Sequence, residues 1–298
     1  MIEDLHWNNY LELNDYLKNN NFNFDYFSTI QLIQWQYYGS KFKFHKLDQV
    51  VIFYIKIKEF KNWKLFNSFY MEGFNLEETI KVIKNDLNIL NNDSDIEIID
   101  FSFQSIKDWK LENYQLIQSN YISNYIYNLE SFKTFSGKKM VKKRNHLNAF
   151  LKQNYNVDVQ NLKEANFNDI IEFTIYLNNK YSNETRKNEI QIYKEFLFNQ
   201  YKKDKRFNGT VFYIDKKIVG YTFGFINKNI YEIIIEKAEK DIRGLYQFIL
   251  KSNLLFHDIK CELIDREDDL GNPMIAKSKH SYHPIEEVKR FCIKKVKW

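Results

Sequence analysis

The sequence predicts an α/β (α+β) protein with two consecutive domains, each built on a mixed, mainly antiparallel sheet. A length of 298 residues fits two domains of ordinary size. With 44% hydrophobic and 17% aromatic residues, the chain can bury a sizeable core. Segments with helical periodicity alternate with aromatic and β-branched segments, which is typical of mixed folds. We expect domains at residues 1–136 and 137–298.

The first half alternates strands and helices. Residues 48–58 (DQVVIFYIKIK) are rich in aromatic and β-branched side chains and predict a strand. The pattern then predicts a helix over 76–90, a strand over 95–103 and a helix over 109–118.

The second half gives the clearest order of elements. A helix is predicted over 137–151, with Met140, Leu147 and Leu151 on one stripe, followed by helices over 168–180 and 189–201. A hairpin is expected next, with strands 210–214 and 218–225 joined by residues 215–217. A strand (230–235), a charged turn (236–241), a helix (243–256) and strands 261–264 and 287–296 complete the order. This is the order of the GNAT acyltransferase fold, and the first half repeats it more loosely. We therefore expect two tandem GNAT-like domains.

Composition narrows the environment and the partners. The net charge of +5 is modest and does not by itself require nucleic acid. No apolar stretch approaches the ~20 residues that span a bilayer, and the first residues lack a basic leader with an apolar core. With two cysteines, a reduced cytoplasmic location is expected. His280 and His283 have no ligand partner at zinc-site spacing, so no metal is expected.

The run from residue 131 to residue 157 contains seven basic side chains and no carboxylate. A solvated surface normally mixes both signs, so this run favours an anionic partner. On the predicted helix, Arg144 falls beside the apolar stripe, and we expect it to be buried and paired. Lys143, Asn145 and His146 are its neighbours. The alternative is that Arg144 meets a structural carboxylate while the lysines are merely solvated.

A second candidate is the strand-to-helix junction at residues 236–249. Gly244 would allow a ligand to approach the backbone, and the N-terminus of the helix favours an anion. Lys237 and Arg243 add positive charge. The alternative is an ordinary charged turn in which Asp241 is the N-cap.

A third candidate is the segment that follows the strand at 261–264. Arg266, Glu267 and Asp269 come first, and Lys277 and Lys279 follow after a turn at Gly271. Carboxylates beside cations suit acid–base chemistry with an oriented substrate. The alternative is a surface salt-bridge cluster.

Taken together, the strings GKKMVKKRNHLNAF, IIIEKAEKDIRGLYQFI and IDREDDLG with AKSKHSYHP resemble the phosphatidylglycerol lysyltransferase C-terminal domain family. The resemblance covers nearly the whole chain. It implies two GNAT-like domains and kinship with enzymes that transfer aminoacyl groups from aminoacyl-tRNA. The chain departs from the family's pattern at Asp265, where Asn is common, at Leu147, where Ile is common, and at Ala276, where a basic residue is expected.

The resemblance also bears on the donor. Users of acetyl-CoA usually carry Q/R-x-x-G-x-G/A at the strand-to-helix junction, whereas this chain has Asp241 and Tyr246 at its first and last positions. An acidic group and a bulky ring would both oppose pyrophosphate, so aminoacyl-tRNA is favoured over acyl-CoA as the donor. No permanently bound cofactor is expected.

The leading hypothesis is aminoacyl transfer to a lipid or another amine or hydroxyl acceptor, with tRNA and an anionic lipid headgroup as partners. Glu267 or Asp269 would accept the proton, and His146 is a further base candidate. The residues expected to bind substrate are Lys143, Arg144, Asn145, Lys237, Arg243, Gly244, Tyr246, Arg266, Lys277 and Lys279. The alternatives are an acetyl-CoA-dependent N-acetyltransferase and a non-catalytic module that binds RNA or anionic lipid. The leading hypothesis requires the three strings to converge on one pocket.

Overall fold

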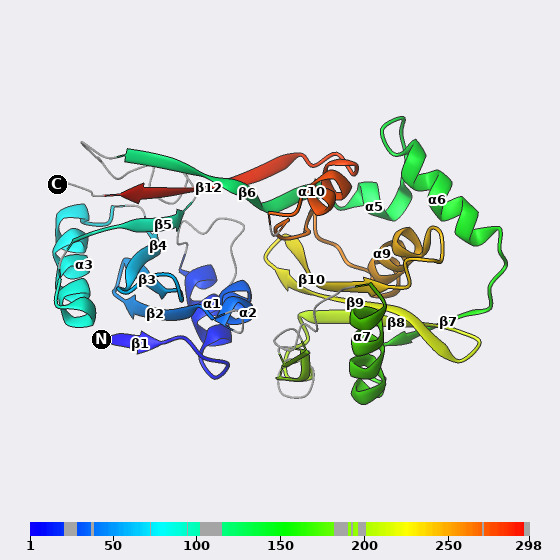
Figure 1. The fold of residues 1–298 in the computed structure, drawn as a ribbon, viewed down its shortest axis with the longest axis horizontal. Coiled ribbons are helices and arrows are strands. Elements are labelled where there is room, and N and C mark those ends of the chain that lie inside the picture. The colour runs from blue at the N-terminus through cyan, green and yellow to red at the C-terminus, as the bar shows by residue number, and fades with distance from the viewer. Residues whose placement is uncertain are drawn as a thin grey trace. The chain divides into compact units, whose positions relative to one another are not determined.

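The chain folds into two compact units (Figure 1). The computed structural model describes residues 1–20, 29–36, 39–71, 73–93, 95–101, 115–181, 190–191, 193–195, 201–269 and 271–294. One unit comprises Met1–Ile122 with Val288–Trp298, and the other comprises Ser123–Glu287. The chain therefore passes between the units within two strands, β6 (Gln115–Asn128) and β12 (Glu286–Lys294). The expected division, after residue 136, lies within the second unit instead.

The first unit is a mixed sheet with helices. Its strands lie in the order β1-β2-β3-β4-β5-β12, and the pairs are antiparallel except for β4 with β5. The elements in chain order are β1 (Ile2–Asp4), α1 (Tyr10–Asn19), α2 (Thr29–Gln36), β2 (Lys41–Lys46), β3 (Val50–Lys56), β4 (Lys64–Tyr70), α3 (Leu76–Asn91) and β5 (Ile98–Phe101).

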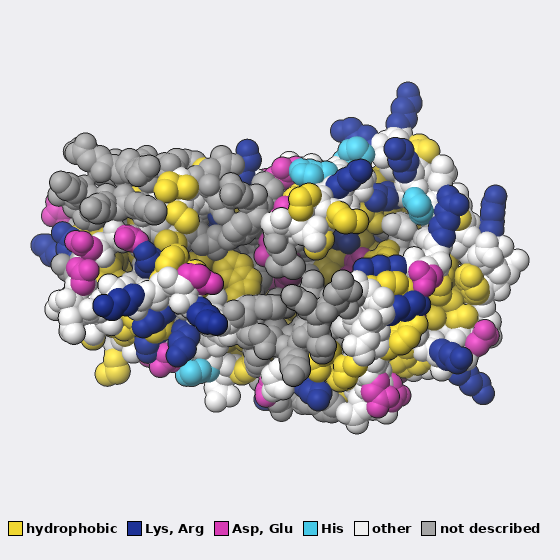
Figure 2. Space-filling model, viewed as in Figure 1, with side chains coloured by type: hydrophobic (Ala, Val, Ile, Leu, Met, Phe, Trp, Pro, Cys, Tyr) yellow, Lys and Arg dark blue, Asp and Glu magenta, His cyan; other side chains and the backbone are white. Residues whose placement is uncertain are grey.

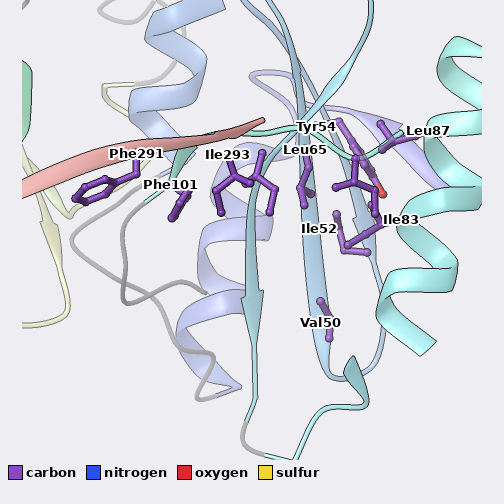
Figure 3. Close-up of a cluster of buried hydrophobic side chains, with 11 residues drawn as sticks. Val50, Ile52, Tyr54, Leu65, Ile83, Leu87, Phe101, Phe291 and Ile293 are labelled. Carbon is purple, nitrogen blue, oxygen red and sulfur yellow. The ribbon is translucent and has the colours of Figure 1, made fainter. Parts of the chain in front are cut away.

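The core of this unit forms around β3, because every residue of that strand except the last is buried. Ile52 packs with Leu65 of β4 and Ile83 of α3 (Figure 3). Phe291 and Ile293, more than two hundred residues further along the chain, belong to the same cluster. The C-terminal strand thus completes the core of the N-terminal unit.

The second unit holds the rest of the elements. Its strands lie in the order β6-β11-β10-β9-β8-β7, and only β10 with β11 is parallel. The elements are α5 (Glu130–Thr134), α6 (Val141–Leu151), β7 (Val157–Asn161), α7 (Phe167–Tyr181), β8 (Phe207–Ile214), β9 (Lys217–Asn227), β10 (Ile230–Ala238), α9 (Leu245–Phe256), β11 (Leu263–Asp265) and α10 (Pro273–His280).

Helices cover both faces of this second sheet, as two adjacent residues of β9 show. A Cβ at Gly220 would collide with Ile249 of α9. The next side chain, Tyr221, points to the other face, where its hydroxyl lies 2.6 Å from that of Thr174 on α7. Helix α9 connects the end of β10 to the start of the parallel strand β11, so its N-terminus lies at the carboxyl end of β10.

The observed elements confirm the predicted fold class and correct several details. The hairpin between β8 and β9 turns through two residues, Asp215 and Lys216, whose positive φ values of 48° and 64° fit a type I′ turn. The charged turn starts later than predicted, because Glu236 still belongs to β10. The helix predicted over 109–118 is wrong at 115–118, which lie in β6, and its other residues are outside the described ones. Of the helix predicted over 189–201, the structure describes 190, 191 and 193–195, which are helical, and Tyr201, which lies in a turn.

Candidate active site at the divergence of two parallel strands

The candidate site lies where β10 and β11 separate. Their parallel pairing covers three residues on each strand, from Ile230 with Leu263 to Glu232 with Asp265. Strand β10 then continues against β9 as far as Ala238, with a shift of register near Ile234, whereas β11 ends. The carboxyl ends of diverging parallel strands are a common place for ligand sites. Side chains at the ends of the two strands can therefore meet, as Glu236 and Arg266 do.

Arg266 occupies this position. Its Nη2 lies 3.1 Å from Oε1 of Glu236 on β10, and the two side chains are only 13% and 9% exposed. The guanidinium carbon lies 4.8 Å from the ring centroid of Tyr282. Gln247 of α9 donates a 2.7 Å hydrogen bond to the Tyr282 hydroxyl. A carboxylate, an aromatic face and an amide thereby fix the guanidinium and its surroundings.

Lys143 brings a second cation to the same ring. Its Nζ lies 3.7 Å from the centroid of Tyr282. Burial and, second, the positive charge of Arg266 lower the pKa of Lys143 to about 8. No carboxylate in the described part of the chain lies within ion-pair distance of this ammonium. Lys143 is therefore a cation that deprotonates easily.

Three buried polar atoms of this cluster have no hydrogen-bond partner among the described residues. They are Nη1 of Arg266, Oε2 of Glu236 and Oε1 of Glu267. Buried polar atoms are nearly always paired, so each such exception needs a reason. On the ion pair of Arg266 with Glu236, one hydrogen-bond donor and one acceptor therefore have no partner among the described residues. Such a pair suits a ligand that carries both an acceptor and a donor.

Lys279 supports the loop on which Arg266 lies. Its Nζ donates to the backbone carbonyls of Arg266, Glu267 and Asp268, at 2.9 Å in the case of Glu267. Burial and, second, the charge of Arg266 lower the pKa of Lys279 to about 8. With its three donors directed at carbonyls, Lys279 holds the loop in place rather than facing a substrate.

The two predicted proton acceptors lie in this loop with different surroundings. Burial, followed by the charges of Asp268 and Asp265, raises the pKa of Glu267 well above its usual range. Asp269 accepts from the Tyr125 hydroxyl at 2.7 Å and from the Gly271 N–H at 2.9 Å. The surroundings of Glu267 therefore oppose its ionised form, whereas two hydrogen bonds hold the carboxylate of Asp269 in place.

The burial and the partners of Arg144 differ from the prediction. It is half-buried, and its Nη1 donates to the carbonyls of Phe135 at 2.7 Å and Gly137 at 3.3 Å. The end of α5 leaves carbonyls without helical partners, and the guanidinium satisfies them. The expectation of a buried charge pair is therefore wrong. The predicted stripe is corrected too, because Met140 and Leu147 are buried but Leu151 is 51% exposed.

Gly244 serves helix packing. It is the N-cap of α9 with φ +83°, and a Cβ there would lie 2.7 Å from the carbonyl carbon of His146 and even closer to its oxygen. The backbone of α6 thus lies directly on the strand-to-helix junction. Burial and, second, the charge of Arg243 lower the pKa of His146.

No described hydrogen bond or ion pair joins the remaining predicted residues to Arg266. Lys237 is half-buried, with its Nζ 5.9 Å from the ring of Tyr193. Tyr246 donates to the Ala238 carbonyl at 3.4 Å, and burial raises its pKa to about 12. Arg243, Asn145 and Lys277 are exposed.

The structure therefore gathers part of the predicted set. Lys143, Arg266, Glu267, Asp269 and Lys279 lie in or beside one cluster, whereas no described contact joins Arg144 or Arg243 to Glu267. Four residues of the cluster were not among the predicted site residues: Glu236, Gln247, Tyr125 and Tyr282. The resemblance contained a signal for the last of these, since the string AKSKHSYHP includes it.

Comparisons with solved structures define the class of fold. A conserved protein of unknown function from Bacteroides thetaiotaomicron aligns over 99% of both chains, with TM-score 0.82 and 19% identity. The structure of L-PGS from Bacillus licheniformis aligns over 99% of this chain and 94% of that one, with TM-score 0.59 and 14% identity. A tandem GNAT protein from the clavulanic acid biosynthesis pathway aligns over 99% and 98%, with TM-score 0.52 and 8% identity. The fold is that of a tandem GNAT-like protein.

The sequence assigns the family. The chain belongs to the family described as phosphatidylglycerol lysyltransferase, C-terminal, whose sequence profile matches residues 103–294. An uncharacterised protein of Mycoplasmoides gallisepticum is 26% identical over 286 residues, covering 90% of this chain and 92% of that protein. The resemblance drawn from the three strings is thereby confirmed.

Within the described ranges, no helix has both the length and the apolar character that crossing a membrane requires.

Proposed function

We propose that this protein transfers an aminoacyl group from aminoacyl-tRNA to a lipid or another acceptor with a hydroxyl or amine. The observation that carries the proposal is the Arg266–Glu236 pair at the divergence of β10 and β11. Nη1 of Arg266 and Oε2 of Glu236, which have no hydrogen-bond partner among the described residues, offer one donor and one acceptor on the same ion pair. An aminoacyl ester presents the complementary groups, a carbonyl oxygen and an α-ammonium.

The reaction then needs little beyond positioning, because the ester is already activated. The acceptor's oxygen or nitrogen bonds to the carbonyl carbon, and the ester bond to the tRNA ribose breaks. Arg266 Nη1 donates to the carbonyl oxygen as it gains negative charge. Neutral Lys143, with its pKa of about 8, takes the proton of the acceptor and returns it to the departing ribose oxygen.

The junction before α9 supports this donor over acetyl-CoA. A pyrophosphate that docks at a helix N-terminus needs open backbone N–H groups. Here the carbonyl of His146 lies against Gly244, and no Cβ would fit between them. Asp241 adds negative charge on the same turn, although it pairs with Lys180 at 2.9 Å.

Transfer assays with Arg266 variants test the proposal. Labelled aminoacyl-tRNA is supplied with phosphatidylglycerol vesicles or with hydroxylamine as a small acceptor, and the labelled product is measured. Arg266→Ala should lower kcat/KM about 100-fold or more, which is typical for loss of one oxyanion donor. Arg206→Ala is the matched control, because Arg206 too has a carboxylate partner, Asp204, and lies over an aromatic ring, that of Phe225.

The controls decide between the alternatives. Acetyl-CoA supplied in place of aminoacyl-tRNA should give no product. Turnover with acetyl-CoA, or an Arg266→Ala variant as active as the Arg206→Ala variant, would contradict the proposed chemistry.

A further inference from the structure

Lys143 differs from the other lysines of α6 in its surroundings. Figure 2 shows Lys and Arg side chains projecting from the surface that α6 forms. Lys142 is exposed, whereas its neighbour Lys143 is half-buried, with its Nζ 3.7 Å from the ring centroid of Tyr282. Among the described residues, no hydrogen bond or ion pair uses the Nζ of Lys143. Once this amine has lost a proton, its lone pair is therefore available to a reaction partner.

Two features of the cluster activate the amine of Lys143 as a nucleophile. It is partly desolvated against the ring of Tyr282, and the guanidinium carbon of Arg266 lies 4.8 Å from the centroid of the same ring. Burial and a neighbouring cation both disfavour the charged form of a lysine, and both are known means of activating one. With a pKa of about 8, Lys143 carries a free amine in about a tenth of the molecules at pH 7.

A second lysine of the cluster shows that geometry, and not the pKa alone, decides which amine can react. Burial and, second, the charge of Arg266 lower the pKa of Lys279 to about 8 as well. The Nζ of Lys279 donates, however, to the backbone carbonyls of Arg266, Glu267 and Asp268. A lone pair on this nitrogen would face one of those oxygens and leave it without a donor. Lys143 has no such partners, so only its amine is free to attack.

The proposed reaction brings an activated ester to the amine of Lys143. Nη1 of Arg266, which has no partner among the described residues, donates to the carbonyl oxygen of the aminoacyl group. Because both cations lie over one ring and the lysine side chain is flexible, the amine can approach the carbonyl carbon. When an acceptor is bound, Lys143 takes its proton. Without an acceptor, the same lone pair can bond to the carbonyl carbon instead.

We infer that Lys143 is a site of self-aminoacylation, at which the protein transfers the aminoacyl group to itself when no acceptor is bound. Nζ of neutral Lys143 bonds to the ester carbonyl carbon, the bond from that carbon to the tRNA ribose oxygen breaks, and one proton of Nζ passes to the ribose oxygen. The product is an amide, whose nitrogen is not basic. The modified protein has therefore lost its proton acceptor. The inference rests on the proposed function for the nature of the donor.

The test looks for label on the protein itself. Wild-type protein is incubated without acceptor with total tRNA that has been charged with labelled amino acids, and its peptides are mapped by mass spectrometry. Lys143 should gain the mass of one aminoacyl residue, and the adduct should survive the mild alkali that removes esters. Lys142 and Lys279 should react at least about 10-fold more slowly, because no described contact joins Lys142 to the cluster and the amine of Lys279 faces carbonyls.

Matched variants and an added acceptor sharpen the test. Lys143→Arg keeps the positive charge but has no nucleophilic amine, so it should lose the label at this position. Lys142→Arg, one residue away, should be labelled like the wild type. After labelling, transfer to hydroxylamine should fall in proportion to the fraction of molecules modified on Lys143. Hydroxylamine present from the start should lower the labelling, because the acceptor and the lysine compete for one ester.

The outcomes separate this inference from the proposed function. Transfer to hydroxylamine with no label on Lys143 would overturn the inference and leave the proposed function standing. Label spread equally over Lys142, Lys143 and Lys279 would indicate unselective acylation and would overturn it too. Label on Lys143 without transfer to any acceptor would support the inference and contradict the proposed acceptors. Neither label nor transfer would reject both.

Discussion

At the scale of single residues, a basic side chain in a motif that suggests anion binding does not always face a ligand. Arg144 and Arg266 both stand in strings that suggest anion binding, yet the first satisfies carbonyls at the end of α5. The second retains a buried donor that nothing described satisfies. The difference lies in which backbone each side chain meets, and only Arg266 meets a carboxylate across a gap between strands.

Lys143 gives the first prediction of pH dependence. Its pKa of about 8 means that the neutral base accumulates as the pH rises through that value. We expect kcat at saturating donor to rise with pH, with a midpoint near 8. Lys143→Met should abolish this rise of kcat with pH. Lys251→Met, which removes a half-buried lysine of α9, should keep it.

Stability gives a second readout for Lys143, and its sign follows from the proton balance. Folded Lys143 loses its proton near pH 8, whereas a lysine in the unfolded chain keeps it to about 10.4. Between these values the unfolded state binds more protons, so the free energy of unfolding gains a contribution that rises with pH. Denaturant titrations should show a smaller rise for Lys143→Met than for the wild type. An unchanged rise would contradict the lowered pKa.

At the scale of elements, the contact between α6 and α9 positions the site. Phe150 packs on Phe248 with ring centroids 4.6 Å apart, and Gly244 allows the two backbones to meet. This contact places Lys143 of α6 and Gln247 of α9 at the same tyrosine. Gly244 therefore contributes to the site by allowing α6 and α9 to pack closely.

Substitution of Gly244 tests this role. Gly244→Ala places a methyl group against the His146 carbonyl and strains a backbone with φ +83°, so we expect a loss of about 3 kcal/mol of unfolding free energy. Gly137→Ala is the matched control, with φ +82° and no atom within 4 Å of the added Cβ. It should lose only about 1 kcal/mol. Equal losses, measured by chemical denaturation, would show that the helix contact is unimportant.

At the scale of the whole molecule, the ends of the chain meet in one unit. Phe291 and Ile293 of β12 belong to the cluster of buried side chains around Ile52 (Figure 3). The N-terminal unit is thus incomplete without β12. A C-terminal truncation should therefore damage the N-terminal unit first.

A single core substitution tests this dependence without truncation. Ile293 is fully buried, and Ile293→Ala should cost about 3 kcal/mol through lost burial and a cavity. In hydrogen exchange, the loss of amide protection should fall on Val50–Lys56 and Leu76–Asn91, which share its core. Ile285→Ala, at a position 62% exposed, should cost less than about 0.5 kcal/mol. Loss of protection confined to Ser123–Glu287 would contradict the shared core.

The sequence by itself determined the periodicity, and therefore most elements of the second unit. The hairpin, the third strand and the following helix were predictable, because alternating and helical patterns are local properties of the chain. The three strings also identified the family and brought Lys143, Arg266 and Lys279 into view. Strand β6 escaped prediction because its ladder partner β11 lies more than one hundred residues away.

Only the tertiary structure decided which charges belong together. Glu236 and Arg266 are thirty residues apart and become partners because β10 and β11 run parallel and then diverge. Tyr282 joins them after α10 has returned the chain to α6 and α9. Whether a carboxylate, a carbonyl or open solvent faces a cation depends on such non-local packing, so the sequence could indicate the residues but could not assign their roles.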